Sequence, residues 1–254
     1  MSSRVVALVR HLPKSFVECV TIGKGAPKAP IDLGLAKAQH SAYVEALRRL
    51  VDDLYVLPAD ESYPDCVFIE DTMVFCRGTF LLTRPGHPSR EGETAGVREV
   101  LLGGQLGRNL RLQAVLGGAD ARLDGGDVLF TGRHLFVGLT TRTNEGGAAA
   151  LQIAVGASVP VHTVEMRDLP EVLHLKCLVT LLRPGLLTYA ADDDGETVIG
   201  RMADHVGSGA YKAIGLEDRE MANVVSIYGS GGWRGTLIQG GRCERSVGVL
   251  RGAF

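Results

Sequence analysis

Four polar residues recur at nearly equal intervals along this 254-residue chain, and each opens a segment whose sequence predicts a β-hairpin. They are Glu70, Asp124, His174 and Asn223, so the intervals are 54 (124 − 70), 50 (174 − 124) and 49 (223 − 174) residues. Between hairpins the pattern predicts a helix and then a strand. A period of about 50 residues is typical of a repeat architecture. We therefore expect a closed ring in which these four polar residues face a common centre.

Apolar runs on both sides of short turns mark the hairpins. The turns fall at Arg77–Gly78, at Thr131–Gly132–Arg133 and at Arg183–Pro184–Gly185. Apolar spacing predicts helices over Leu33–Val51, Thr143–Val155 and Glu196–His205, and strands over Val5–Arg10, Leu54–Leu57, 161–166 and Ala222–Tyr228. The alternation of strands and helices indicates the α/β class.

A simpler interpretation of the repeat is that strand starts are polar in any α/β unit. A single polar residue at such a position is more often structural than catalytic. Four polar residues at equivalent positions of the repeat, of which two are carboxylates and one is an imidazole, favour a functional site.

Composition excludes several classes of protein. The net charge of −2 lacks the basic footprint of a nucleic-acid-binding protein. No apolar run approaches the roughly 20 residues that a membrane helix needs, and the stretch before Arg10 is shorter than that of a secretory signal. We expect a cytoplasmic protein that binds neither nucleic acid nor membrane.

The five cysteines are scattered, odd in number and without a CxxC pair. They are Cys19, Cys66, Cys76, Cys177 and Cys243. This pattern favours reduced thiols over a disulfide framework and gives no zinc-site spacing. Cys66, Cys76 and Cys177 lie in apolar runs, which predicts buried, inert thiols.

Five motifs closely resemble those of the dimethylarginine dimethylaminohydrolase family. They are PDCVFIED (64–71), TRPGHPSR (83–90), LDGGDVLFTGR (123–133), TRTN (141–144) and VLHLK (172–176). The resemblance extends from residue 5 to about residue 225. It implies a pentein-like, five-bladed α/β propeller of ββαβ repeats, formed by residues 1–254 as one catalytic domain whose last unit is truncated.

The activity that this resemblance implies is hydrolysis of Nω,Nω-dimethyl-L-arginine and Nω-methyl-L-arginine to L-citrulline and the corresponding amine. The reaction would pass through a covalent cysteine thiouronium intermediate, without a metal or organic cofactor. The partner would be the small-molecule substrate alone, and the chain would be a monomer or a homodimer.

The resemblance also implies which residues hold the substrate. Glu70 and Asp71 would hold the guanidinium, and Asp65 would hold the α-amino end. Arg90 and Arg142 would hold the α-carboxylate. Adjacent residues on a strand point in opposite directions, so Glu70 and Asp71 can share a ligand only if the backbone bends there.

Hydrolysis of a guanidinium requires more than binding, because its carbon is a poor electrophile and amines leave only when protonated. A thiolate must attack the carbon, and an imidazole must protonate the departing amine. A carboxylate should orient that imidazole. The resemblance assigns the last two roles to His174 and Asp124.

Each of these residues also has a structural interpretation. Asp124 precedes Gly125–Gly126 and could be a turn residue. His174 lies between leucines, as a satisfied core histidine would, and arginines such as Arg90 and Arg142 are usually exposed. Asp127 is a candidate structural hydrogen-bond acceptor.

The C-terminal segment departs from the family pattern. The family's nucleophile is a cysteine near the chain end after an Asp-Gly segment, which this chain lacks. Cys243 is the candidate nucleophile, although another alignment places Val247 there. The sequence of residues 245–251 predicts a closing strand. The segment between the last hairpin and this strand is too short to contain a helix.

Three functions therefore remain open: a dimethylargininase, a non-catalytic binder of arginine derivatives, and an arginine deiminase-like hydrolase. Deiminases usually carry an inserted helical domain that is absent here.

Overall fold

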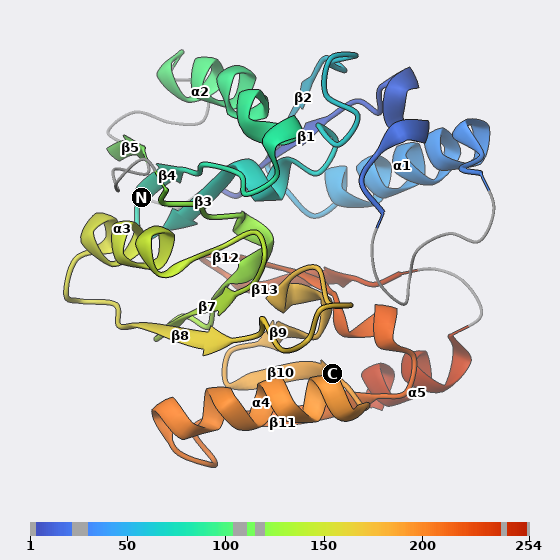
Figure 1. The fold of residues 1–254 in the computed structure, drawn as a ribbon. Coiled ribbons are helices and arrows are strands. Elements are labelled where there is room, and N and C mark those ends of the chain that lie inside the picture. The colour runs from blue at the N-terminus through green and yellow to red at the C-terminus, as the bar shows by residue number, and fades with distance from the viewer. Residues whose placement is uncertain (1–3, 22–29, 104–110, 115–119, 240–242, 253–254) are drawn as a thin grey trace.

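The computed structural model describes residues 4–21, 30–103, 111–114, 120–239 and 243–252. Within them the chain forms five small sheets, with helices arranged on the outside (Figure 1). Three sheets have three strands each: β3 (Met73–Cys76), β4 (Thr79–Leu82) and β5 (Arg111–Ala114); β6 (Val128–Phe130), β7 (Leu135–Leu139) and β8 (Val161–Glu165); and β9 (Val179–Arg183), β10 (Leu186–Ala190) and β11 (Lys212–Leu216).

Each three-stranded sheet is one repeat unit. Its first two strands form an antiparallel hairpin, a helix follows, and the third strand pairs in parallel with the second. The helices are α2 (Thr94–Leu102), α3 (Glu145–Val155) and α4 (Asp193–Val206). The hairpins turn at Gly78, Gly132 and Gly185, whose φ angles of +83°, +87° and +79° favour glycine. The three predicted hairpins are confirmed.

The first and last units have two-stranded sheets. β1 (Val6–Arg10) and β2 (Asp53–Leu57) pair in parallel around α1 (Leu33–Arg48), whereas β12 (Val225–Gly229) and β13 (Gly232–Leu237) form a hairpin. Ile227 of β12 packs in one apolar cluster with Val9 and Leu47. The two ends of the chain therefore meet, and the predicted ring closes through side-chain packing rather than a shared sheet.

One-turn 3-10 helices bring the repeat positions together. They span Ile69–Thr72, Gly125–Asp127, Leu175–Cys177 and Arg219–Ala222. Successive members of this series are in contact, and the first strands of the following hairpins are neighbours, β6 beside β9 and β9 beside β12. Glu70 lies within the first turn, Asp124 and His174 directly precede the second and third, and Asn223 follows the fourth. This arrangement explains why residues 50 apart in sequence converge.

Apolar side chains join neighbouring units into a continuous core. Leu129 and Phe136 of one hairpin share a cluster with Leu178, Val198 and Met202 of the next unit. Each fully buried aliphatic or aromatic side chain contributes about 1.5–3 kcal/mol relative to exposure. The ring centre is thus held by packing between units, and its polar turns need not supply the stability.

The strand predicted over residues 245–251 is wrong, because the segment is a helix, α5 (Glu244–Gly252). Val247 and Leu250 pack with Leu182 and Met221, whereas Val249 is exposed. The buried pair is three residues apart, which is helical spacing. A helix therefore follows the last hairpin after all. The described residues contain no strand after this helix.

Among the described residues, no helix combines the length and apolarity that crossing a membrane would require.

Candidate active site

A cavity of about 750 Å³ opens where the 3-10 turns meet. Its walls are apolar on the side of β1 and α1, with Leu8, Val9 and Tyr43 among the lining residues. Its polar lining includes all five predicted substrate-binding residues and the predicted imidazole: Asp65, Glu70, Asp71, Arg90, Arg142 and His174. The structure therefore brings together residues that span 110 positions of sequence (174 − 65 + 1).

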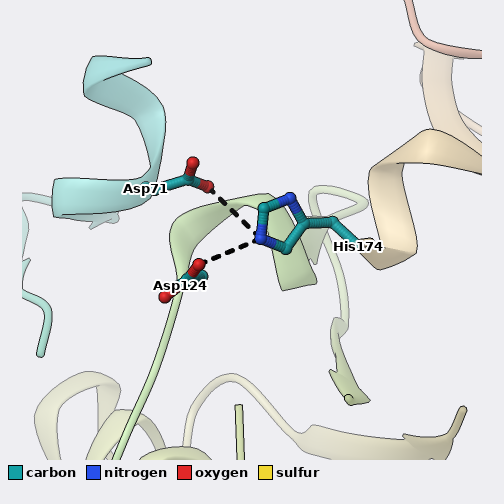
Figure 2. Close-up of side chains that lie close together, drawn as sticks. All are labelled: Asp71, Asp124 and His174. Carbon is teal, nitrogen blue, oxygen red and sulfur yellow. Dashed lines mark hydrogen bonds and ion pairs between the residues drawn. The ribbon is translucent and has the colours of Figure 1, made fainter. Parts of the chain in front are cut away.

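Asp124 and His174 form a buried pair at the base of this site (Figure 2). Oδ2 of Asp124 is 3.0 Å from Nε2 of His174, within the predicted hydrogen-bond range. The other carboxylate oxygen of Asp124 accepts from the backbone N–H of Gly86 at 2.7 Å. Asp124 does not cap its own turn, so its interactions match a positioning role better than a turn role.

Asp71 approaches the same ring nitrogen of His174 (Figure 2). Its Oδ1 lies 4.0 Å from Nε2 of His174 and accepts from the backbone N–H of Gly126 at 2.8 Å. Its Oδ2 accepts from Nη1 of Arg90 at 2.7 Å. Both oxygens are thus held in place before any ligand binds.

Glu70 and Asp71 lie in a 3-10 turn, so the backbone bend that the sequence required is present. Both residues line the cavity, but their environments differ. The Glu70 side chain is 61% exposed and pairs with Nζ of Lys176 at 2.6 Å. An incoming guanidinium would therefore compete with Lys176 for Glu70.

The protonation state of His174 is set by its neighbours. Burial disfavours the imidazolium, but the charge of Asp71, the hydrogen bond to Asp124 and the charge of Asp127 outweigh burial and raise the pKa of His174 to about 9. Burial likewise opposes ionisation of Asp71, yet His174 and Arg90 hold the pKa of that carboxyl below its usual value. At neutral pH the imidazole therefore carries a proton that it can donate.

The two arginines differ in the donors that they have left. Arg90 binds Glu93 through Nε and Nη2 and Asp71 through Nη1, and Nη2 also donates to the carbonyls of Asp65 and Phe68. Arg142 lies 4.0 Å from Asp124 and its buried Nη1 has no hydrogen-bond partner among the described residues. Of the two arginines, Arg142 is therefore the one with a guanidinium nitrogen that makes no hydrogen bond to the described residues.

Asp65 and Asp127 are buried carboxylates with different surroundings. Asp65 lines the cavity and accepts from the backbone N–H of Val20 at 3.1 and 3.2 Å. Asp127 accepts from Thr140 Oγ1 at 2.8 Å and from the backbone N–H of Leu175 at 3.0 Å, which joins two repeat units. The predicted structural role of Asp127 is confirmed by these contacts.

The structure does not bring Cys243 to the cavity. The described lining residues do not include it, and its side chain packs with the cluster that contains Leu182 and Met221. Partial burial together with Asp218 and Glu220 raises the pKa of its thiol. The tail helix carries Cys243 onto this apolar cluster, which explains why position near the chain end did not predict proximity to His174.

Cys177 is the lining thiol that sequence reasoning assigned to the core. Its pKa is raised to about 11, first by burial and further by Asp127 and Asp71. A signal was present in the repeat: Asp71, Asp127 and Cys177 are each the third residue of a 3-10 turn. Cys177 lies three residues beyond His174, just as Asp127 lies three residues beyond Asp124, so the repeat spacing points to this position.

Asp71, Asp124 and His174 could also serve as metal ligands, since one donor atom from each lies within 4.8 Å of the others. Their charges are, however, already opposed by cations. Arg90 pairs with Asp71, Arg142 lies near Asp124, and the imidazole is protonated. This electrostatic balance favours proton transfer over metal coordination at the site.

Comparisons with known proteins agree with this geometry. No family model matches the chain. It is 43% identical over 159 residues to the N(G),N(G)-dimethylarginine dimethylaminohydrolase of Streptomyces coelicolor, covering 61% of this chain and 57% of that protein. It is 42% identical over 226 residues to the human protein named Putative hydrolase DDAH2, covering 87% and 74% respectively.

Solved structures support the same fold. A mutant of the Pseudomonas aeruginosa dimethylarginine dimethylaminohydrolase complexed with citrulline matches with a TM-score of 0.79 at 23% identity, covering 98% of this chain and 89% of that one. A dimethylarginine dimethylaminohydrolase adduct with 4-chloro-2-hydroxymethylpyridine matches with a TM-score of 0.73 at 25% identity, covering 99% and 90%. Taken with the human relative, of which the match covers 74%, these findings identify the chain as a member of the dimethylarginine dimethylaminohydrolase family.

Proposed function

We propose that this protein hydrolyses Nω-methylated L-arginines to L-citrulline and the corresponding methylamine. The observation that carries the proposal is the buried Asp124–His174 pair beside Asp71, in a cavity that also holds the other predicted substrate-binding residues. The names of the curated relatives and the citrulline complex of a solved relative support the same substrate class.

The charges of the cavity suit both ends of a methylarginine. Glu70 exchanges its bond to Lys176 for the substrate guanidinium, and the fixed carboxylate of Asp71 supports the same cation. Asp65 accepts from the α-ammonium group. The unpartnered Nη1 of Arg142 donates to the α-carboxylate, while Arg90, whose donors are largely used, holds Asp71 in place.

The proposed chemistry has two halves that share one imidazole. A thiolate adds to the guanidinium carbon, and the C–N bond breaks as His174 passes its proton to the departing methylamine. A covalent thiouronium remains. His174 then takes a proton from water, and the hydroxide adds to the same carbon. The C–S bond breaks to return the thiolate, the new hydroxyl group loses its proton to solvent, and citrulline leaves. Asp124 stabilises the imidazolium that exists before the first transfer and again after the second.

The second candidate function is binding of arginine derivatives without turnover. It is favoured by the thiols, because Cys243 does not line the cavity and burial holds the pKa of Cys177 at about 11. Only the thiolate is nucleophilic. The carboxylates and the arginine that are proposed to bind substrate would still be present in such a protein.

Two measurements on the same preparation separate these functions. Citrulline release from dimethylarginine and from arginine tests turnover and distinguishes a dimethylargininase from a deiminase. Calorimetric titration with dimethylarginine measures binding alone. Turnover supports the proposal, whereas binding without citrulline supports the second candidate. Neither turnover nor binding would overturn both.

Thiol labelling identifies the nucleophile if turnover is found. A haloacetamidine, which mimics the guanidinium, is expected to alkylate the reacting cysteine and to be blocked by substrate. Peptide mapping then assigns the label to Cys243 or Cys177. Cys243→Ser and Cys177→Ser provide matched variants, and the one that abolishes citrulline release without abolishing ligand binding marks the nucleophile. Retention of turnover in both variants would contradict a nucleophilic role for either thiol.

A further inference from the structure

Three histidines gather outside the active-site cavity, where the sheet of β6, β7 and β8 meets α4. His134 precedes β7, His162 lies on β8, and His205 lies in the last turn of α4. Nδ1 of His134 is 2.8 Å from Nε2 of His162, and the two rings stack with centroids 5.1 Å apart. The rings of His162 and His205 have centroids 5.2 Å apart.

The fold orients these rings before any ligand is present. Phe136 pairs with His162 across the β7–β8 ladder, and His134 is two residues before Phe136, so all three share one face of the sheet. The Phe136 ring packs 5.4 Å from that of His162, and Tyr211 meets the His134 ring edge-on. Each of the two imidazoles therefore packs against an aromatic ring.

Hydrogen bonding defines which nitrogens carry lone pairs. The facing nitrogens of His134 and His162 share one proton, because one must donate and the other accept. Nε2 of His205 lies 2.8 Å from the carbonyl oxygen of Thr163, which can only accept. That nitrogen is therefore protonated, and Nδ1 of a neutral His205 is left as an acceptor.

The surroundings lower the pKa of both facing imidazoles. Partial burial, and then the charge of Arg133, lower the pKa of His134. Partial burial, and then the neighbouring His134 and His205, lower the pKa of His162. Neutral imidazole is the form that coordinates metal ions.

We propose that His134 and His162 form a binding site for a divalent late transition-metal ion such as Zn²⁺, with His205 as a third ligand after side-chain rotation. At a metal–nitrogen distance of about 2.0–2.1 Å, tetrahedral ligands lie about 3.4 Å apart, so the facing nitrogens separate by about 0.6 Å. Rotation of two partly exposed side chains can supply that movement. An all-imidazole set selects Zn²⁺, Ni²⁺ or Cu²⁺ over Mg²⁺ and Ca²⁺.

The position of the site gives binding a structural consequence. β8 and α4 belong to successive repeat units, so an ion held by His162 and His205 joins them. An ion that binds only the folded chain raises its stability with concentration. Because the ion displaces the proton shared by the pair, its affinity falls as the pH is lowered.

The test is a titration of the metal-free full chain with Co²⁺ and Ni²⁺, followed by calorimetry and visible absorption. We expect one ion per chain and no thiolate-to-cobalt charge-transfer band. His134→Gln and His162→Gln should each weaken binding at least about tenfold, and His205→Gln by less. His87→Gln, a half-buried histidine elsewhere, is the matched control and should bind as the unaltered chain does.

A second variant excludes the active site as the location of the ion. His174→Gln should leave binding unchanged, since His174 lies in the catalytic cavity. Loss of binding in His174→Gln alone, unchanged binding in His162→Gln, or a thiolate band would each overturn the proposal. Should a variant fail to fold, paramagnetic Ni²⁺ must broaden the imidazole NMR signals of His134 and His162 in the unaltered chain, and sharp signals would equally overturn it.

Discussion

The two middle hairpins and the ring-closing region differ in how their polar groups are held. In the middle hairpins, Asp124, Asp127 and His174 are buried at the turns that start β6 and β9, and each carboxylate is fixed by backbone N–H groups. At the closure, β1–β2 meets β12–β13 through side-chain packing and the exposed pair of Arg234 and Asp52. The pair of Asp124 and His174 is therefore held by buried contacts, whereas the closure is held by apolar packing and a partly exposed ion pair.

The difference bears on the proposed function, because the charged residues proposed to bind substrate line one cavity, whereas Cys243 packs on a separate apolar cluster. A binding measurement and a turnover measurement therefore probe different parts of the molecule.

The largest expected effect is at the imidazole. His174→Gln removes the proton donor but keeps a polar side chain in place, and citrulline release should fall about 10²–10⁴-fold. The measurement is kcat/KM for dimethylarginine, with binding followed by calorimetry. Near-normal turnover in this variant would break the assignment of catalysis to the middle hairpins.

The same residue predicts a pH dependence. The pKa of His174 is raised from 6.5 to about 9 in the folded protein. The stability contributed by its ion pairs is fully present below pH 6.5 and is lost as the pH rises through about 9. The free energy of unfolding should therefore decline over this window, and His174→Gln should lack that decline.

Arg142→Lys tests the opposite end of the substrate. Lysine keeps the charge but cannot make a bidentate contact with a carboxylate. We expect a loss of about tenfold or more in kcat/KM for dimethylarginine, on the scale of charge-assisted bonds of about 1.5–3 kcal/mol, and a smaller loss for methylguanidine. Equal losses on both compounds would show that Arg142 acts on Asp124 rather than on the substrate carboxylate.

Stability measurements sharpen the contrast between the two regions. Asp127→Ala leaves the N–H of Leu175 and the hydroxyl of Thr140 without their acceptor, at a cost of about 1–3 kcal/mol for each unsatisfied group. Arg234→Ala breaks a solvent-accessible pair at the closure, where a smaller loss is expected because water screens the charges. Urea unfolding of both variants compares them directly, and a larger effect at Arg234 would reverse the proposed order.

The sequence predicted the fold where local patterns were strong. Three hairpins, helices α1, α3 and α4, and the convergence of the four phased residues followed from apolar runs and turn residues. The hairpin expected after Asn223 is present, but its second strand, β13, was not located because its sequence, GWRGTL, is rich in glycine, which strands disfavour. Helix α2 is nine residues long with a glycine inside, and gave no clear periodicity.

The site was predictable as a set of residues but not as a network. Motif resemblance named Arg90, yet its engagement with Glu93 depends on a 3-10 turn that no periodicity indicated. Cys177 was assigned to the core because its neighbours are apolar; it does pack against the apolar cluster that contains Phe136 and Leu178, and it also lines the cavity. The tail was misassigned because Val247 and Val249 alternate like strand residues, and only tertiary packing selects the helical pair Val247 and Leu250.

The row of charges through the active site has a consequence for the proton balance of ligand binding. Glu93, Arg90, Asp71, His174, Asp124 and Arg142 alternate in sign, with three anions and three cations, so the empty row is neutral. A bound guanidinium adds a cation beside Asp71 and lowers the affinity of His174 for its proton. Association with methylarginine should therefore be accompanied by partial proton release, visible as a heat that varies with the ionisation enthalpy of the buffer, and ligand affinity should increase as the pH approaches 9.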